Sequence, residues 1–124
     1  MSIQLQKPEY IIVYVSDMDR SLAFYRDTLG LPLKSTSPGW TEFDTGTTMI
    51  VLHATPASKP AYQPGRTPAG VAQLGFIVED LQSVYETLKA QDVVFAMPPR
   101  LQSSGVTLAV LRDPDGLGIT LQQS

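Results

Sequence analysis

His53 is the side chain of this sequence best suited to acid–base chemistry, because it is the only histidine among the 124 residues. An unperturbed imidazole titrates near pH 6.5, so it can act as a general base or anchor a ligand. His53 also stands at the end of an apolar run, where an exposed histidine without a role is the alternative. The chain has no cysteine, which excludes disulfides, thiolate nucleophiles and cysteine-bound zinc.

Trp40 and Glu42 are two further candidates, and they are two residues apart in a segment that is expected to be extended. Residues i and i+2 of a strand share a face. The single Trp40 can stack on a planar ligand, or it can pack in the core or in a dimer interface. Glu42 can pair with a cationic ligand, or it can be a solvated carboxylate. The sequence has no recognisable Ser–His–Asp order, phosphate-binding glycine loop or paired-carboxylate motif.

The charge distribution argues against nucleic acid as a partner. The nine Lys and Arg residues are scattered and the net charge is −3, whereas phosphate binding needs clustered positive charge. No apolar run approaches the roughly 20 residues that span a bilayer, and the first ten residues do not resemble a secretory signal. We therefore expect no membrane partner and a cytoplasmic location.

The first half of the chain predicts a strand, a helix and three further strands. Residues 10–15 are β-branched and aromatic without a breaker, which is typical of a buried strand. Asp17 can cap the following helix, whose apolar residues recur at helical spacing until Gly30 ends it. The three further strands are expected at 33–35, 40–44 and 48–53.

The same order recurs 63 residues later. A strand is expected at 71–78, and Asp80 can cap a second amphipathic helix. Three more strand candidates follow at 93–96, 106–112 and 118–122. The turn Asp113-Pro114-Asp115-Gly116 separates the last two, and all of its residues are turn formers.

This repetition predicts an α+β fold built from two βαβββ modules. A period of about 60 residues is too long for a solenoid repeat, although a coincidence between two ordinary βα units is the alternative. We expect a single domain over residues 1–124, with a first module at about 8–54, a linker at 55–70 and a second module at about 71–124. The linker is rich in proline and glycine, as an irregular connection would be.

Two motifs give the sequence a family resemblance. The stretch VSDMDRSLAFY at 15–25, followed by LGL at 29–31, resembles the V-x-D-x-x-x-S-x-x-F-Y…L-G-L opening of the glyoxalase/bleomycin resistance/dioxygenase superfamily, also called the vicinal oxygen chelate superfamily. The DPDG turn at 113–116 resembles its closing motif. The resemblance implies curved mixed sheets around a cavity, helices on the outer face and a homodimer. Both motifs are structural, so they carry no chemistry by themselves.

The resemblance also implies where a metal ion would be bound. In metal-dependent members, four strand positions supply His, Glu or Gln to one divalent ion, and those positions here are Tyr10, Val51, Gln73 and Thr120. This set is a poor site, because valine has no donor atom and the other three offer only weak neutral oxygens. Shifting the alignment to Glu9 would turn that side chain to the opposite face. We therefore expect no metal and no cofactor.

Period-two alternation extends these positions along the strands. If Tyr10 and Val51 face inward, Ile12, Met49 and His53 do as well, and Trp40 can join them. The expected ligand-binding residues are Tyr10, Ile12, Trp40, Met49, Val51, His53, Gln73 and Thr120. Such a mixture of aromatic, apolar and hydrogen-bonding groups suits a small organic ligand.

Three functions are compatible with this set of residues. The first is a metal-free protein that binds a small molecule, similar to the drug-sequestering members of the family. The alternative is an enzyme (a lyase, isomerase or dioxygenase) that uses a divalent metal or Tyr10 and His53, so whether the chain is an enzyme is left open. The third is a domain whose ancestral site has decayed and which is kept for protein interaction.

Overall fold

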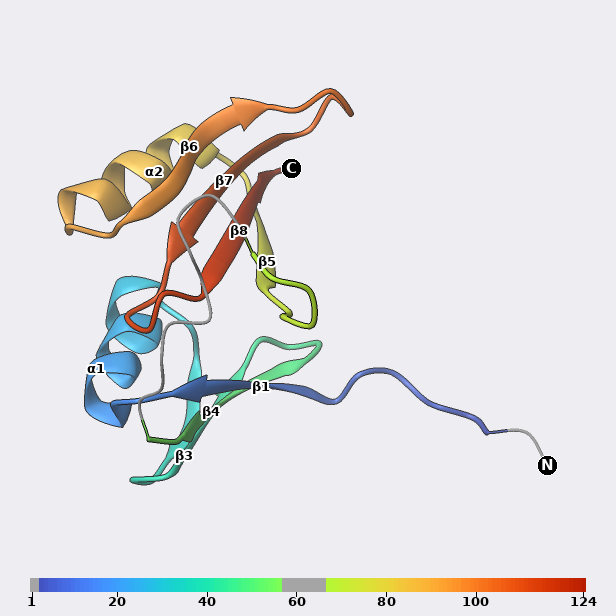
Figure 1. The fold of residues 1–124 in the computed structure, drawn as a ribbon, viewed down its shortest axis with the longest axis vertical. Helices are drawn as coiled ribbons and strands as arrows, with labels where there is room; N and C mark the ends of the chain where they lie inside the picture. The colour runs from blue at the N-terminus through green and yellow to red at the C-terminus, as the bar shows by residue number, and fades with distance from the viewer. Residues whose placement is uncertain (1–2, 57–66) are drawn as a thin grey trace. The chain divides into compact units, whose positions relative to one another are not determined.

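The computed structural model describes residues 3–56 and 67–124, which form two compact units, Met1–Ala57 and Ser58–Ser124. Each unit holds one four-stranded sheet and one helical segment (Figure 1). Most of the linker expected at 55–70 lies outside the described residues. Within those residues, neither helical segment has the length and apolar character of a membrane-spanning helix.

The first unit follows the predicted order of strand, helix and three strands. Its elements are β1 (Tyr10–Val15), α1 (Met18–Leu22), η1 (Ala23–Thr28), β2 (Leu33–Thr36), β3 (Trp40–Asp44) and β4 (Met49–Ala54). The strands are arranged as β1-β4-β3-β2, which we call the first sheet. Strand β1 is parallel to β4 and the other pairs are antiparallel, so the sheet is mixed, as the family resemblance implied.

The core of the first unit lies between the helical segment and one face of the first sheet. Val13, Phe43 and Leu52 project from three different strands and are buried there. Tyr25, from η1, is fully buried and its ring lies 6.3 Å from that of Phe43 and 5.3 Å from that of Phe24. This ring cluster therefore holds the helical segment on the sheet.

The helix begins as predicted but changes its pitch. Asp17 is the N-cap, and its Oδ1 accepts a hydrogen bond from the backbone N of Arg20 at 3.1 Å. After Leu22 the turns widen into the π-helix η1, where the backbone N of Leu29 donates to the carbonyl of Phe24. Apolar spacing indicates which side chains face the sheet, but it does not fix the hydrogen-bonding step of the helix. Gly30 ends the segment with a φ of +76°.

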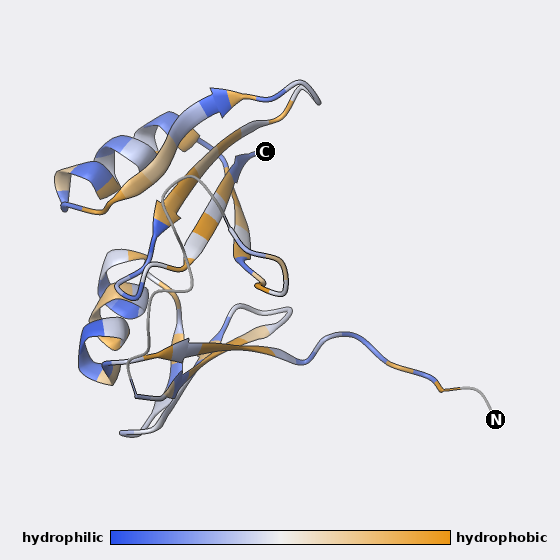
Figure 2. Ribbon diagram, viewed as in Figure 1, coloured by the Kyte–Doolittle hydropathy of each residue, from blue (hydrophilic) through white to orange (hydrophobic). Residues whose placement is uncertain are grey.

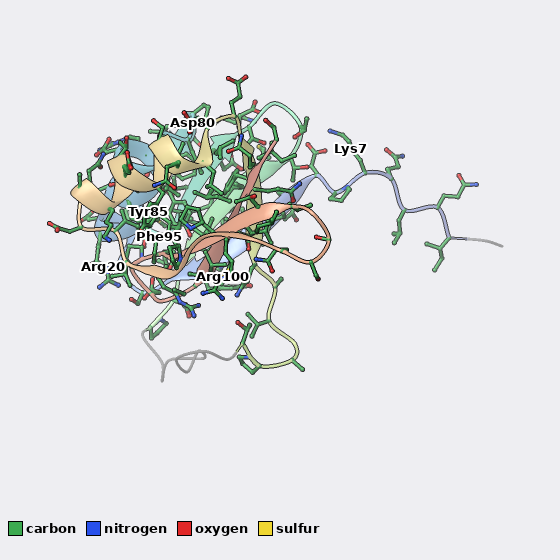
Figure 3. The ribbon with its side chains drawn as sticks, turned by 90° about the horizontal axis from the view of Figure 1, so that it is seen from above. Lys7, Arg20, Asp80, Tyr85, Phe95 and Arg100 are labelled. Carbon is green, nitrogen blue, oxygen red and sulfur yellow. The ribbon has the colours of Figure 1, made fainter. Side chains whose placement is uncertain are left out.

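The second unit repeats this plan. Its elements are β5 (Leu74–Val78), α2 (Leu81–Ala90), β6 (Phe95–Leu101), β7 (Thr107–Arg112) and β8 (Gly118–Gln123), with the strands in the order β5-β8-β7-β6. Asp80 caps α2 as expected, accepting from the backbone N of Ser83 at 3.1 Å. Tyr85 and Phe95 meet edge to face with ring centroids 4.7 Å apart and join α2 to β6 (Figure 3). Apolar residues run along β7 and β8 (Figure 2).

Two predicted strands of the second unit had the wrong bounds. Strand β5 begins at Leu74, so Gln73 precedes the strand that was expected to contain it. Strand β6 was expected at 93–96 but occupies Phe95–Leu101, running through Pro98 and Pro99. Proline is tolerated there because β6 is an edge strand, and its register with β7 shifts between Met97 and Arg100.

The strand registers confirm the internal repeat. Ile12 pairs with Val51 in the first sheet, and Gly75 pairs with Thr120 in the second. Gly75 follows Ile12 by the predicted 63 residues, so Val51 and Thr120 occupy corresponding places. Each position in the first sheet therefore has a structural counterpart in the second.

Two buried hydroxyl groups of the first unit allow a matched stability prediction. The Ser21 hydroxyl is buried without a hydrogen-bond partner among the described residues, whereas the Thr41 hydroxyl lies 2.7 Å from that of Thr36. Burying an unpaired polar group is costly, so Ser21→Ala should leave stability unchanged or raise it by up to about 1 kcal/mol. Thr41→Val should lower it by about 1 kcal/mol. Urea unfolding of both variants checks this, and a large loss in Ser21→Ala would contradict it.

Candidate functional site

Three rings lie side by side on the face of the first sheet opposite its helix, which we call the open face. His53 of β4 is paired with Tyr14 of β1 on one side and with Trp40 of β3 on the other. The ring centroids are 5.4 Å apart for Tyr14 and His53, and 5.5 Å apart for Trp40 and His53. We call these three residues the aromatic row. The rings are inclined by 37° and 61°, so they do not form one flat platform.

The aromatic row is accessible to a ligand. Tyr14 is 60% exposed, while Trp40 and His53 are half-buried. The alternative of an exposed histidine without neighbours does not describe His53, because it is half-buried and lies between two rings. Trp40 lies outside the core, which leaves ligand stacking or a subunit contact as its possible roles.

Glu42 lies beside the aromatic row and provides a negative charge there. Its Oε2 accepts a hydrogen bond from Trp40 Nε1 at 3.2 Å, and its Oε1 accepts one from Ser35 Oγ at 3.1 Å. The bond from Trp40, followed by that from Ser35, lowers the pKa of Glu42 below its usual range; the positive charge of Lys34 acts in the same direction. Glu42 is therefore a fixed carboxylate with lone pairs to spare.

Lys34 and Ser35 were not predicted as site residues. They come to the open face because the register of β2 against β3 shifts between Leu33 and Ser35, which is an extra residue in one strand. Lys34 Nζ lies 3.7 Å from Met49 Sδ on this face. Strict alternation would have put neighbouring residues on opposite faces, so no signal in the sequence identifies this pair.

The six predicted site residues of the first unit share the open face. In the strand registers Tyr10 pairs with Met49, Ile12 with Val51, and Trp40 with His53. Tyr10 is 51% exposed, whereas Val51 is fully buried and has no surface to offer a ligand. The alternative residue, Glu9, is exposed and lies 3.7 Å from Lys7 Nζ in an ion pair.

The remaining two predicted residues, Gln73 and Thr120, belong to the second unit. Thr120 is half-buried in β8. Gln73 folds its carboxamide over Gly118, where an added methyl group would lie 2.6 Å from its Nε2. The same Nε2 donates to Thr67 Oγ1 at 3.3 Å. Gln73 thus fills the space over a glycine.

The internal repeat shows that the aromatic row has no counterpart in the second sheet. Gln122 and Leu108 are paired in the second sheet in the places of His53 and Trp40, and Ile77 takes the place of Tyr14. Val110, paired with Thr120, replaces Glu42. These positions of the second sheet therefore carry neither a ring nor a carboxylate, and the two modules do not share the recognition groups.

The four positions of the family's metal site do not fit a metal ion. Val51 is buried and has no donor atom, and Gln73 could offer only the single neutral oxygen of its carboxamide. Tyr10 and Thr120 are neutral hydroxyl groups, which are weak ligands for divalent cations. Among residues 3–56 and 67–124, no three His, Asp or Glu side chains gather into a group able to hold an ion.

The pKa of Glu42 should respond to the removal of its main donor. Trp40→Phe deletes the Nε1–H group and should raise that pKa toward the usual value near 4.5. The lowered pKa contributes stability that is present above the usual value and is lost as the pH falls through the folded value. A carboxyl carbon NMR titration measures the change. Tyr14→Phe, two strands away, is the control, and an equal shift in both variants would contradict the assignment.

The fold and the open face define a small α+β protein with two βαβββ modules and one aromatic, acidic sheet surface. The sequence profile of the Glyoxalase/Bleomycin resistance protein/Dioxygenase superfamily matches residues 7–121. The protein belongs to this superfamily, as the two sequence motifs predicted. No curated protein matches the sequence.

Several solved structures are similar to this chain. A superfamily member from Sphaerobacter thermophilus is 25% identical with a TM-score of 0.72, covering 97% of this chain and 98% of that chain. A protein of unknown function from Agrobacterium tumefaciens is 24% identical with a TM-score of 0.77, covering 98% and 97%. A lactoylglutathione lyase from the same species is 20% identical with a TM-score of 0.74, covering 97% and 95%. The last two likenesses show the fold alone.

Proposed function

We propose that this protein binds a small organic molecule on the open face of its first sheet, without a metal ion. The observation that carries the proposal is the aromatic row, in which Tyr14, His53 and Trp40 lie within 5.5 Å of their neighbours and remain partly exposed. Exposed rings with a few polar groups beside them are typical of ligand sites. Tyr10, Ile12 and Met49 extend this surface along β1 and β4.

A melting screen of small organic compounds on chelator-washed protein tests the proposal. A compound that binds the folded state raises its stability by mass action, by about 2.7 kcal/mol at a hundred times its dissociation constant. The chain has a single tryptophan, so the indole N–H signal of Trp40 in a proton–nitrogen NMR spectrum locates the compound. Stabilising compounds that leave this signal unmoved would contradict the proposed site.

Metal analysis is the companion test. Elemental mass spectrometry before and after a chelator wash, with manganese, iron, nickel and zinc added back, should find substoichiometric metal and no gain in melting temperature. A stoichiometric ion that survives washing would overturn the metal-free proposal and move His53 and Glu42 to the front as ligands.

His53 supports a second candidate, an enzyme of this superfamily in which the imidazole exchanges protons with the bound molecule. It is half-buried between two rings on the same face that we propose for the ligand. If so, mass spectrometry should recover a bound compound chemically altered after incubation with the protein but not with His53→Gln. Unaltered compound in both cases favours binding alone.

Assembly as a homodimer in the cytoplasm completes the proposal. Ile77 of β5 and Leu101 of β6 are 69% and 70% exposed, which is unusual for large apolar side chains and supports a partner surface on the second unit. Light scattering after size exclusion measures the oligomeric state. A monomer at high concentration would contradict the dimer.

A further inference from the structure

The open face of the first sheet combines aromatic rings with an anion, and this combination selects a charge. The ring faces of tyrosine and tryptophan carry partial negative charge, so they attract cations within about 6 Å. Glu42 adds a full negative charge directly beside Trp40, to whose indole nitrogen it is hydrogen-bonded at 3.2 Å. The rings and the carboxylate both favour a positively charged ligand.

The other charged side chains of this face leave it acidic, which also favours a cation. Asp44 shares the parity of Trp40 and Glu42 on β3 and is exposed, with its Oδ1 accepting from the backbone N of Gly46 at 2.8 Å. Lys34 is the opposing charge, and its exposed ammonium group lies 3.7 Å from Met49 Sδ. Two carboxylates against one ammonium group leave the face acidic.

The tilt of the rings indicates the shape of the ligand. Because the rings are inclined by 37° and 61° to their neighbour, a large flat molecule cannot stack on all three at once. A compact group can rest against two inclined neighbouring rings, and an organic ammonium ion is a compact group that aromatic rings attract. A quaternary ammonium ion has no N–H donor, so it needs an anion nearby rather than a directed hydrogen bond.

We propose that the open face of the first sheet recognises an organic ammonium cation, held by the aromatic row of Tyr14, His53 and Trp40 and by the carboxylate of Glu42. This inference rests on the proposed function, because it names the class of ligand for the same site. The second sheet lacks the recognition groups, since Leu108 and Val110 stand where Trp40 and Glu42 do. The cation therefore binds at the first unit.

Choline and its neutral isostere 3,3-dimethylbutan-1-ol form a matched pair of probes, since they differ only in charge. Both are titrated at low ionic strength, because salt screens exposed charges, and the Trp40 indole N–H signal is followed. Choline should move this signal saturably with an affinity about tenfold higher than that of the alcohol. Equal affinities would overturn the cation proposal but leave small-molecule binding at this site intact.

Three variants separate the charge effect from general damage. Glu42→Gln should weaken choline about three- to tenfold and leave the alcohol unchanged. Lys34→Met removes the competing cation and should strengthen choline about two- to threefold. Glu86→Gln makes the same charge change on α2 of the second unit and should leave the affinity for choline unchanged. An affinity for choline that is unchanged in Glu42→Gln would overturn the role of the carboxylate.

Two other outcomes would also overturn the proposal. If neither probe moves the Trp40 signal but compounds from the melting screen do, the site binds small molecules of another class. If the signal instead moves with protein concentration alone, a second copy of the chain covers the open face. Failure of every screened compound to move the signal is the separate result that defeats the proposed function itself.

Discussion

Replacing Tyr25 by alanine is expected to lower the free energy of unfolding by about 3–5 kcal/mol, because a fully buried aromatic ring leaves a cavity that the core cannot close. The ring lies against both Phe24 and Phe43, so its loss also detaches η1 from the first sheet. A loss of this size is a large fraction of the stability of a small domain.

Tyr14→Ala is the matched control for this prediction. It makes the same substitution in the same unit, but Tyr14 lies on the open face and is 60% exposed. Its effect on stability should stay within about 0.5 kcal/mol. Urea unfolding followed by circular dichroism measures both variants. Equal losses would show that the helix-side core and the open face have been assigned to the wrong sides of the sheet.

Replacing Trp40 by alanine should have the largest effect on binding. The change removes one of the three rings of the aromatic row and the donor that holds Glu42, so it deletes two recognition features at once. Truncating a central aromatic residue of a binding site commonly costs 2 kcal/mol or more, which is about a thirtyfold loss of affinity. Calorimetry with a compound from the melting screen gives the value.

The internal repeat supplies the control for that measurement. Leu108 occupies in the second sheet the place that Trp40 occupies in the first, since it pairs with Gln122 as Trp40 pairs with His53. Leu108→Ala should therefore change the affinity by no more than about twofold, because it removes no ring and no hydrogen-bond donor of the proposed site. If both variants lose binding equally, the ligand does not distinguish the two sheets.

Local signals predicted most of the fold because they act over a few residues. Asp17 and Asp80 cap their helices as expected, and the bounds of β1 and β3 match those predicted from the sequence. The repeat at 63 residues then predicted the same order of elements in both units, which the structure has. The prolines of β6 made the predicted strand end too early, because whether a strand lies at an edge depends on the sheet and not on the strand's own sequence.

The candidate site was predicted only in part, for a physical reason. Alternation placed Trp40, Met49 and His53 on one face correctly, since the strand registers there are regular. The contribution of Lys34 and Ser35 depends on an irregularity in β2 that alternation cannot describe. The hydrogen bond between Trp40 and Glu42 likewise depends on side-chain conformation, which spacing leaves free.

The difference between the two sheets indicates which of them binds the ligand. The modules share their order of elements and the pairing of their last two strands, so the fold by itself does not explain why only the first sheet carries rings and a carboxylate on the face opposite its helix. Val51 and Thr120, which correspond in the repeat, offer no charged ligand in either module. Recognition of an organic molecule by the first sheet accounts for these residues without a metal ion.

The most direct test of this account is the Trp40 indole N–H signal of chelator-washed protein during titration with a compound from the melting screen. We predict that the signal moves saturably, with the dissociation constant that calorimetry gives, and that restoring divalent metals changes neither value. A signal that stays in place for every stabilising compound, or that moves only after metal is restored, would contradict the account.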